Sequence, residues 1–169
     1  MLAGQFRMTA ATRVRRKLCY ASFDDVLADA ERLVRAGATT TGSWSLDQIL
    51  GHLAIAIEKS LDTNPDELGW KPPWYIRLAG RYLIKRRILK RGMPSGFKLP
   101  AEVEDRVVPA AGGDLNAALE RLRRAAARLR SDSPRWPHPI FGPMPPDEWN
   151  RWHLRHAELH LSFVKEPSS

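Results

Sequence analysis

The sequence predicts an all-α domain, and three observations lead to this fold class. Apolar residues recur at helical spacing in four long segments, whereas no segment shows the alternation of apolar and polar residues that marks a half-buried strand. A length of 169 residues suits one domain with its own core. Hydrophobic residues make up 43% of the chain and charged residues 27%, as in globular proteins and unlike disordered ones. We therefore expect a four-helix bundle.

The first two expected helices have clear boundary signals. Ser22 is a suitable N-cap for the first apolar periodicity, and Gly37 can end that helix. Ser45 and Gln48 form an S-x-x-Q capping box ahead of the second apolar run. This box predicts that the second helix occupies roughly residues 46–61.

A long connection follows the second helix. Residues 62–113 contain six prolines, which indicates that most of this stretch is loop and that it crosses the bundle or covers one end of it. One helical piece inside it, from Trp74 to Arg91, is amphipathic and basic. Four aromatic residues of the connection could wall a pocket for an apolar substrate, although a small satellite core is the simpler interpretation. They are Trp70, Trp74, Tyr75 and Phe97.

The last two expected helices complete the domain. Asp114 can cap the strongest apolar periodicity of the chain, over residues 115–130. The final helix begins with Pro-Pro-Asp-Glu, a favourable first turn, and is expected over residues 146–165. We expect residues 1–16 to form a basic, disordered arm and residues 17–166 to form a single domain.

Charge and composition narrow the classes of function. A net charge of +8 admits a nucleic acid or an anionic surface as a partner. The basic residues of KRRILKR and RLRRAAARLR are spread around their helices, so we expect no specific nucleic-acid binding. No apolar run is long enough to span a membrane, and a single cysteine, Cys19, cannot form an intrachain disulfide. We expect a cytoplasmic protein without membrane insertion, and a homodimer is left open.

Histidines give the main chemical signal. His153, His156 and His160 project from one narrow face of the final helix, and His156 and His160 have the H-x-x-x-H spacing that lets two imidazoles bind one ion. His52 lies at the border of the apolar face of the second helix, so three rings can meet in the bundle interior. Three protein ligands would leave a position open for water or substrate. His153 is a fourth ligand, a proton shuttle and thus the candidate catalytic residue, or a packing group.

No carboxylate is expected beside these histidines. The stretch HAELH departs from the zinc-protease motif H-E-x-x-H, because Ala157 follows the first histidine and Glu158 lies about 200° further round the helix. Glu58 and Asp47 also point away from His52 on the second helix. The expected nucleophile is therefore a thiolate or water on the metal, without a protein base.

Two segments resemble a known superfamily. WSLDQILGHL, in which a Trp-Ser start leads to a histidine eight residues after the tryptophan, resembles the second helix of the DinB/YfiT-like superfamily of metalloenzymes. HPIFGPMPPDEWNRWHLRHAELHLSF looks like one branch of that superfamily, a domain family of unknown function that reads roughly HP-x-FG, EEW and H-x-x-x-H. The resemblance extends from about Lys17 to Lys165.

This resemblance implies an up-down-down-up four-helix bundle with a divalent metal ion, zinc or nickel, on His52, His156 and His160. It also implies a thiol-dependent transferase that uses a low-molecular-weight thiol as co-substrate and acts on a small-molecule substrate. A metal-dependent hydrolase is the alternative reaction. A further alternative is a non-catalytic basic bundle that binds nucleic acid or a protein partner.

Overall fold

The structure is a computed structural model that describes residues 15–68, 71–96, 104, 106–131 and 135–166. This part of the chain is mostly helical, as predicted. The long helices are α1 (Phe23–Arg35), α2 (Leu46–Asp62), α6 (Leu115–Arg130) and α7 (Pro146–Leu161). Shorter elements are η1 (Pro65–Leu68), α3 (Trp74–Ala79), the π-helical turn η2 (Gly80–Ile84), α4 (Lys85–Arg91), and the strands β1 (Thr39–Thr40) and β2 (Val164–Lys165).

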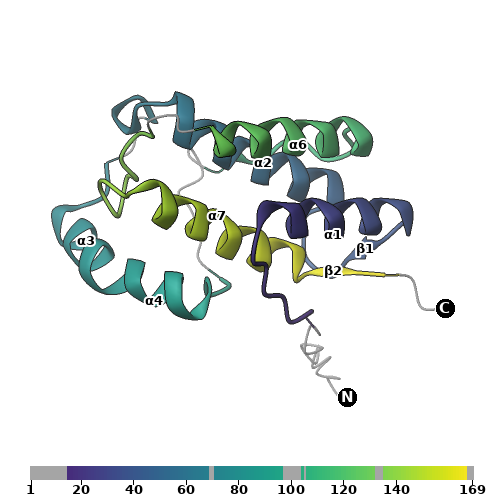
Figure 1. Ribbon diagram of the computed structural model, residues 1–169, viewed down its shortest axis with the longest axis horizontal. Coiled ribbons are helices and arrows are strands. Elements are labelled where there is room, and N and C mark those ends of the chain that lie inside the picture. Colours follow the sequence, from purple (N-terminus) through teal and green to yellow (C-terminus); the bar gives the residue numbers. More distant parts are fainter. Residues whose placement is uncertain (1–14, 69–70, 97–103, 105, 132–134, 167–169) are drawn as a thin grey trace, which may run out of the picture.

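The four long helices share one hydrophobic core. Figure 1 shows α2 and α6 side by side, with α1 and α7 next to them and α3 to α4 on the other side of α7. Apolar side chains from all four long helices fill the interior, and the fully buried ones include Leu33, Leu50, Leu122 and Leu161. In the described residues, no helix is both long and apolar enough to cross a membrane.

The predicted end of the last helix is wrong. The helix ends at Leu161 and not near Lys165, because Val164 and Lys165 pair antiparallel with Thr40 and Thr39. Val164 is completely buried in this arrangement. Strand pairing and burial of one valine therefore override the helical tendency of the final residues.

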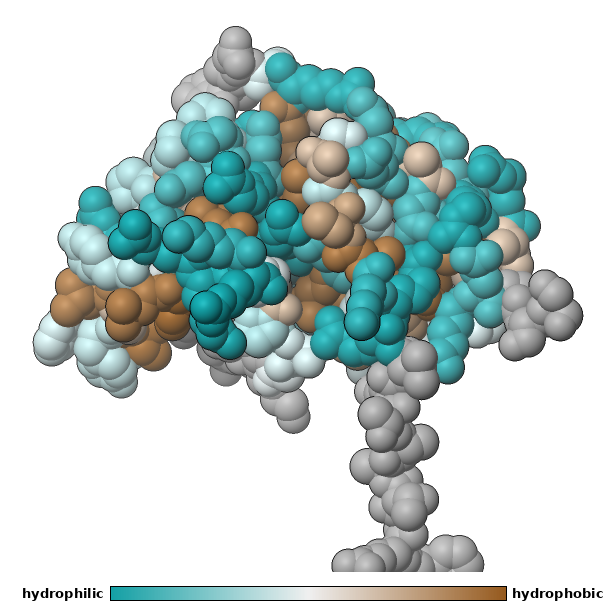
Figure 2. Space-filling view, turned by 60° about the horizontal axis from the view of Figure 1, so that its bottom comes forward, coloured by the Kyte–Doolittle hydropathy of each residue, from teal (hydrophilic) through white to brown (hydrophobic). Residues whose placement is uncertain are grey.

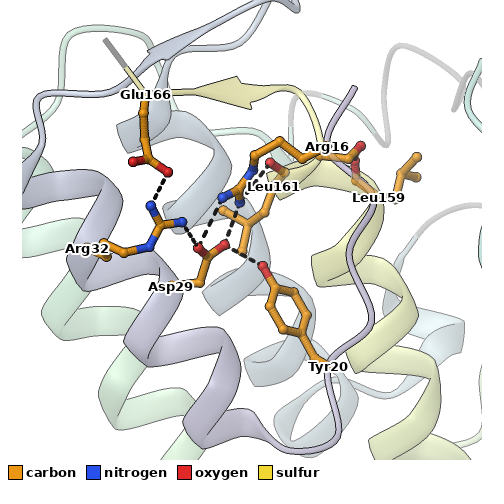
Figure 3. Close-up of polar contacts among 8 residues, drawn as sticks. Arg16, Tyr20, Asp29, Arg32, Leu159, Leu161 and Glu166 are labelled. Carbon is orange, nitrogen blue, oxygen red and sulfur yellow. Dashed lines mark hydrogen bonds and ion pairs between the residues drawn. The ribbon is translucent and has the colours of Figure 1, made fainter. Parts of the chain in front are cut away.

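A polar cluster holds the N-terminal segment against α1 and the end of α7 (Figure 3). The Arg16 guanidinium donates two hydrogen bonds to the Asp29 carboxylate, at 3.1 and 2.5 Å, and a weaker one to the carbonyl of Leu161. The Tyr20 hydroxyl donates to Asp29 at 2.6 Å, and Arg32 also contacts this carboxylate. Of the predicted disordered arm, residues 1–14 lie outside the described residues, whereas its last residues belong to this cluster and fix the end of α7.

The helical piece in the long connection is present, with one unexpected feature. Residues 74–91 form one helix without a gap, in which the π turn η2 lies between the α-helical segments α3 and α4. In a regular α-helix, residues eight positions apart are about 80° out of phase, and the wider π turn reduces this offset. Gly80 and Ile88 can therefore both face the body of the protein, where Gly80 lies so close to Ile140 that a Cβ atom would approach its Cγ2 to 2.4 Å.

The expectation for the aromatic residues of this connection is corrected. Trp74 and Tyr75 neither wall a pocket nor join a satellite core, because they are 74% and 58% exposed. Trp70 and Phe97 lie outside the described residues. The small second core is instead built around the end of α4 and the start of α7, from Ile88, Phe141, Met144 and Trp149.

Candidate metal centre

Three histidine side chains from two helices converge in the interior. His52 comes from α2, and His156 and His160 come from successive turns of α7. His156 Nε2 lies 3.1 Å from His52 Nε2 and 3.0 Å from His160 Nε2, and one ligand atom from each ring lies within 4.8 Å of the others. The structure thus brings together the three residues that the sequence predicted as ligands.

A backbone carbonyl from the long connection orients His52. His52 Nδ1 lies 2.8 Å from the carbonyl oxygen of Val107, so Nδ1 carries the proton and donates it. One turn earlier on α2, the Gln48 amide donates to the carbonyl of Pro109 at 2.9 Å. A Cβ atom on Gly51 would come within 2.7 Å of the Pro109 ring, so glycine is required for this close approach. The segment around Val107 is therefore held along α2, and the lone pair of His52 Nε2 faces the other two histidines.

Hydrogen bonds among the three rings alone cannot satisfy all of these nitrogen contacts with good geometry. Because His52 Nε2 bears a lone pair, a proton in its contact with His156 must sit on His156 Nε2. That single N–H can serve both His52 and His160 only as a bent three-centre hydrogen bond. A cation at the centre would instead meet three lone pairs. The two distances from His156 Nε2 suit it, since ligands about 2.1 Å from an ion lie about 3.0–3.4 Å apart in octahedral or tetrahedral geometry.

Burial keeps the three rings neutral. Burial lowers the pKa of His52, against a smaller opposing effect of its hydrogen bond to Val107. Burial, with the neighbouring His160 and His52, lowers the pKa of His156 well below its usual value, and burial followed by His52 lowers the pKa of His160 to about 3. Metal binding at neutral pH would therefore release no net proton from these rings, although the His156 proton would have to move from Nε2 to Nδ1.

Comparison with known proteins identifies the family. The family model described as "Protein of unknown function (DUF1569)" matches residues 12–167, which include all three histidines. The chain belongs to this family. No curated protein and no solved structure gives a significant match. The resemblance to the DinB/YfiT-like superfamily stays a prediction.

Two tryptophans line the three-histidine cluster of this DUF1569 protein. Trp44, just before α2, stacks on His160 with ring centres 5.1 Å apart and meets the edge of His52. Trp152, one turn before His156 on α7, lies 4.9 Å from that ring. In the described residues His156 Nδ1 has no hydrogen-bond partner, so packing against Trp152 takes the place of a hydrogen bond in orienting this ring. No sequence pattern indicated this role, although Trp152 and His156 share a helix face.

His153 lies apart from the three converging rings. The Ser60 hydroxyl donates its hydrogen bond to the carbonyl of Ile57, so its oxygen accepts from His153 Nε2–H at 3.1 Å. The His153 ring stacks on Trp149 with a centroid distance of 5.4 Å. Of the three roles considered for His153, these contacts favour the packing group, and a catalytic role stays a prediction.

His138 organises the loop that precedes α7. Its Nδ1 accepts hydrogen bonds from the backbone N–H groups of Ile140 and Phe141, and its backbone pairs with Gly142 in both directions. Gly142 has φ of 71°, which glycine adopts readily. The HP-x-FG stretch is thus a structural turn that places Phe141 in the second core.

The acidic residues considered beside the centre are engaged elsewhere, as predicted. Glu58 accepts two hydrogen bonds from Arg121, and Asp47 accepts one from the backbone of Gly113. Glu158 accepts from the backbone N–H of Tyr20 at 2.8 Å, on the side of α7 away from the histidines. These three carboxylates do not reach the three histidines.

Proposed function

We propose that this DUF1569 protein binds one divalent metal ion, zinc or nickel, through Nε2 of His52, His156 and His160. The observation that carries the proposal is the meeting of three neutral imidazoles, two of them buried and His160 half-buried, with one ring nitrogen of each within 4.8 Å of the others. Imidazole is a preferred ligand of both metals. The surrounding fold is proposed to be the up-down-down-up four-helix bundle of the DinB/YfiT-like type, for which the shared core of α1, α2, α6 and α7 is the support.

The proposed activity is a thiol-dependent transfer to a small-molecule substrate. A divalent ion lowers the pKa of a thiol or water that it binds and so supplies a nucleophile near neutral pH. The absence of Glu58, Asp47 and Glu158 from the centre favours a thiol, since hydrolysis makes more use of a nearby proton acceptor. Trp44 and Trp152 would offer an apolar surface to an electrophilic substrate.

Metal content of protein purified without a histidine tag tests the first part. We expect about one ion per chain in the wild type, a large loss in each of His52→Ala, His156→Ala and His160→Ala, and full retention in the matched control His153→Gln. Circular dichroism checks that every variant is folded. Equal metal content in the wild type and the His156→Ala/His160→Ala double variant would refute the site.

Turnover of electrophilic substrates with and without low-molecular-weight thiols tests the second part. In the proposed transfer the thiol loses its proton to solvent, its sulfur forms a bond to an electrophilic carbon, and the leaving group departs from that carbon. We expect turnover that requires a thiol and disappears in His156→Ala. Ester or amide turnover at the same rate without a thiol would favour the metal-dependent hydrolase instead. A loaded but inactive protein would favour the non-catalytic alternative.

A further inference from the structure

An apolar surface is exposed on the helical part of the long connection. Trp74 and Leu83 are 74% and 70% exposed, and the other large apolar side chains of α3 and η2 are exposed as well. These are Tyr75, Ile76, Leu78, Tyr82 and Ile84. Figure 2 shows hydrophobic residues gathered at the left end of the molecule, where Figure 1 places α3. Such a concentration of exposed apolar side chains on one helix marks an interaction surface.

Unpaired positive charge surrounds this surface. The sequence from Lys71 to Gly96 contains eight basic residues and no acidic one. Lys71 and Lys85 form ion pairs with Asp66 and Glu148. Within the described part of the chain, the other six basic side chains of this segment have no ion pair. They are Arg77, Arg81, Arg86, Arg87, Lys90 and Arg91.

The arginines of α6 show the contrast. Arg121 is paired with Glu58, Arg123 with Glu31, and Arg128 with Asp62, and all three acids lie on neighbouring helices. Their charge is therefore largely compensated within the fold. The positive charge of the α3 to α4 segment is left for a partner.

The exposed face is held in position by contacts on its inner side. Gly80 lies against Ile140, and Ile88 and Leu89 are buried towards the body of the protein. Lys85 reaches Glu148 at the start of α7, at a distance of 2.7 Å. The helix is thus anchored by one side while the apolar and basic residues of the other side point outward.

We propose that the α3 to α4 segment docks on an anionic lipid surface. Tryptophan, tyrosine and leucine of α3 and η2 would lie at the boundary of headgroups and acyl chains, where aromatic side chains are favoured. Arg86, Arg87, Lys90 and Arg91 of α4 would meet the negative headgroups. A second copy of the chain is a poorer partner for this face, because two such basic surfaces would repel each other. The proposal does not depend on the metal centre.

Flotation with lipid vesicles tests the proposal. We expect the full chain to bind vesicles of phosphatidylcholine with about 30% phosphatidylglycerol, to bind pure phosphatidylcholine much less, and to lose binding as salt screens the charges. Arg86→Gln/Arg87→Gln should weaken binding about twenty-fivefold, since each basic side chain near an anionic surface contributes about fivefold. Trp74→Ser/Leu78→Ser should weaken it at least as much, and Trp74→Phe should retain most of it.

A matched control separates this surface from the overall charge. Arg124 and Arg151 are exposed on α6 and α7, so Arg124→Gln/Arg151→Gln removes the same charge from another surface and should change binding less than about twofold. All variants should keep the metal content of the wild type. No vesicle binding, or equal losses in the two arginine pairs, would overturn the proposal. Self-association that Trp74→Ser/Leu78→Ser abolishes would also overturn the proposal, because it would identify a second copy of the chain as the partner. Tighter binding to duplex DNA or polyglutamate than to anionic vesicles would overturn it as well.

Discussion

Replacing His153 with glutamine should weaken the dependence of stability on pH. Burial, followed by the charge of Arg135, lowers the pKa of His153 to about 3, so this ring stays neutral in the folded protein. In the unfolded chain its pKa returns to about 6.5. The unfolded state therefore binds more protons as pH falls below 6.5, and the stability that neutral His153 supplies above that pH is lost progressively towards pH 3. Glutamine can still donate a hydrogen bond to Ser60 but does not titrate.

The expected magnitude follows from this difference in pKa. At pH 8 the variant should be less stable by about 1 kcal/mol, because it loses the stacking of the imidazole on Trp149. Protonation of the unfolded chain at one histidine lowers the stability of the wild type by about 1.4 kcal/mol at pH 5.5 and about 2 kcal/mol at pH 5. The order of stability should therefore reverse, with the variant more stable by about 1 kcal/mol at pH 5.

Urea unfolding followed by tryptophan fluorescence measures these differences. Both proteins should be metal-free, so that metal binding does not contribute to stability. The free energy of unfolding is compared at about pH 8, 6.5, 5.5 and 5. A difference between wild type and variant that stays constant from pH 8 to pH 5 would refute the assignment of a neutral, buried His153.

Two further predictions concern stability. Gly80→Ala should lower the free energy of unfolding by about 1–3 kcal/mol, because the new methyl group would overlap Ile140 where α3 to α4 packs on the body; thermal unfolding checks this, and an unchanged midpoint would contradict the close approach. Asp29→Ala should cost about 2 kcal/mol, because it leaves the Tyr20 hydroxyl and the Arg16 guanidinium without their shared acceptor. Urea unfolding of this variant with Asp24→Ala as an exposed control measures the loss, and equal effects of the two changes would contradict it.

The convergence of the three histidines could be predicted from local patterns to a large extent. The spacing of His156 and His160 places both rings on one side of α7 whatever the rest of the chain does, because helical geometry determines it. The position of His52 on the apolar side of α2 directs its ring inward for the same reason. The three rings then meet because α2 and α7 pack against each other.

The surroundings of the centre could not be predicted in the same way. The hydrogen bond of His52 to Val107 joins residues 55 positions apart and depends on the close approach of Pro109 to Gly51. Trp44 precedes its helix, so no periodicity indicated that it would stack on His160. Both contacts arise from loops, whose course is set by packing and not by a repeating pattern.

Local residue patterns alone determined where the long helices begin, the N-caps of the first three of them and the inward faces that carry the histidines, because these depend on interactions within a few residues. Only the tertiary structure decided that Val164 leaves the helix to pair with Thr40, that Arg16 and Tyr20 meet Asp29, and that Trp74 lies at the surface. Each of these outcomes depends on a partner distant in sequence, or on the lack of one. Burial and long-range hydrogen bonding then outweigh local propensity.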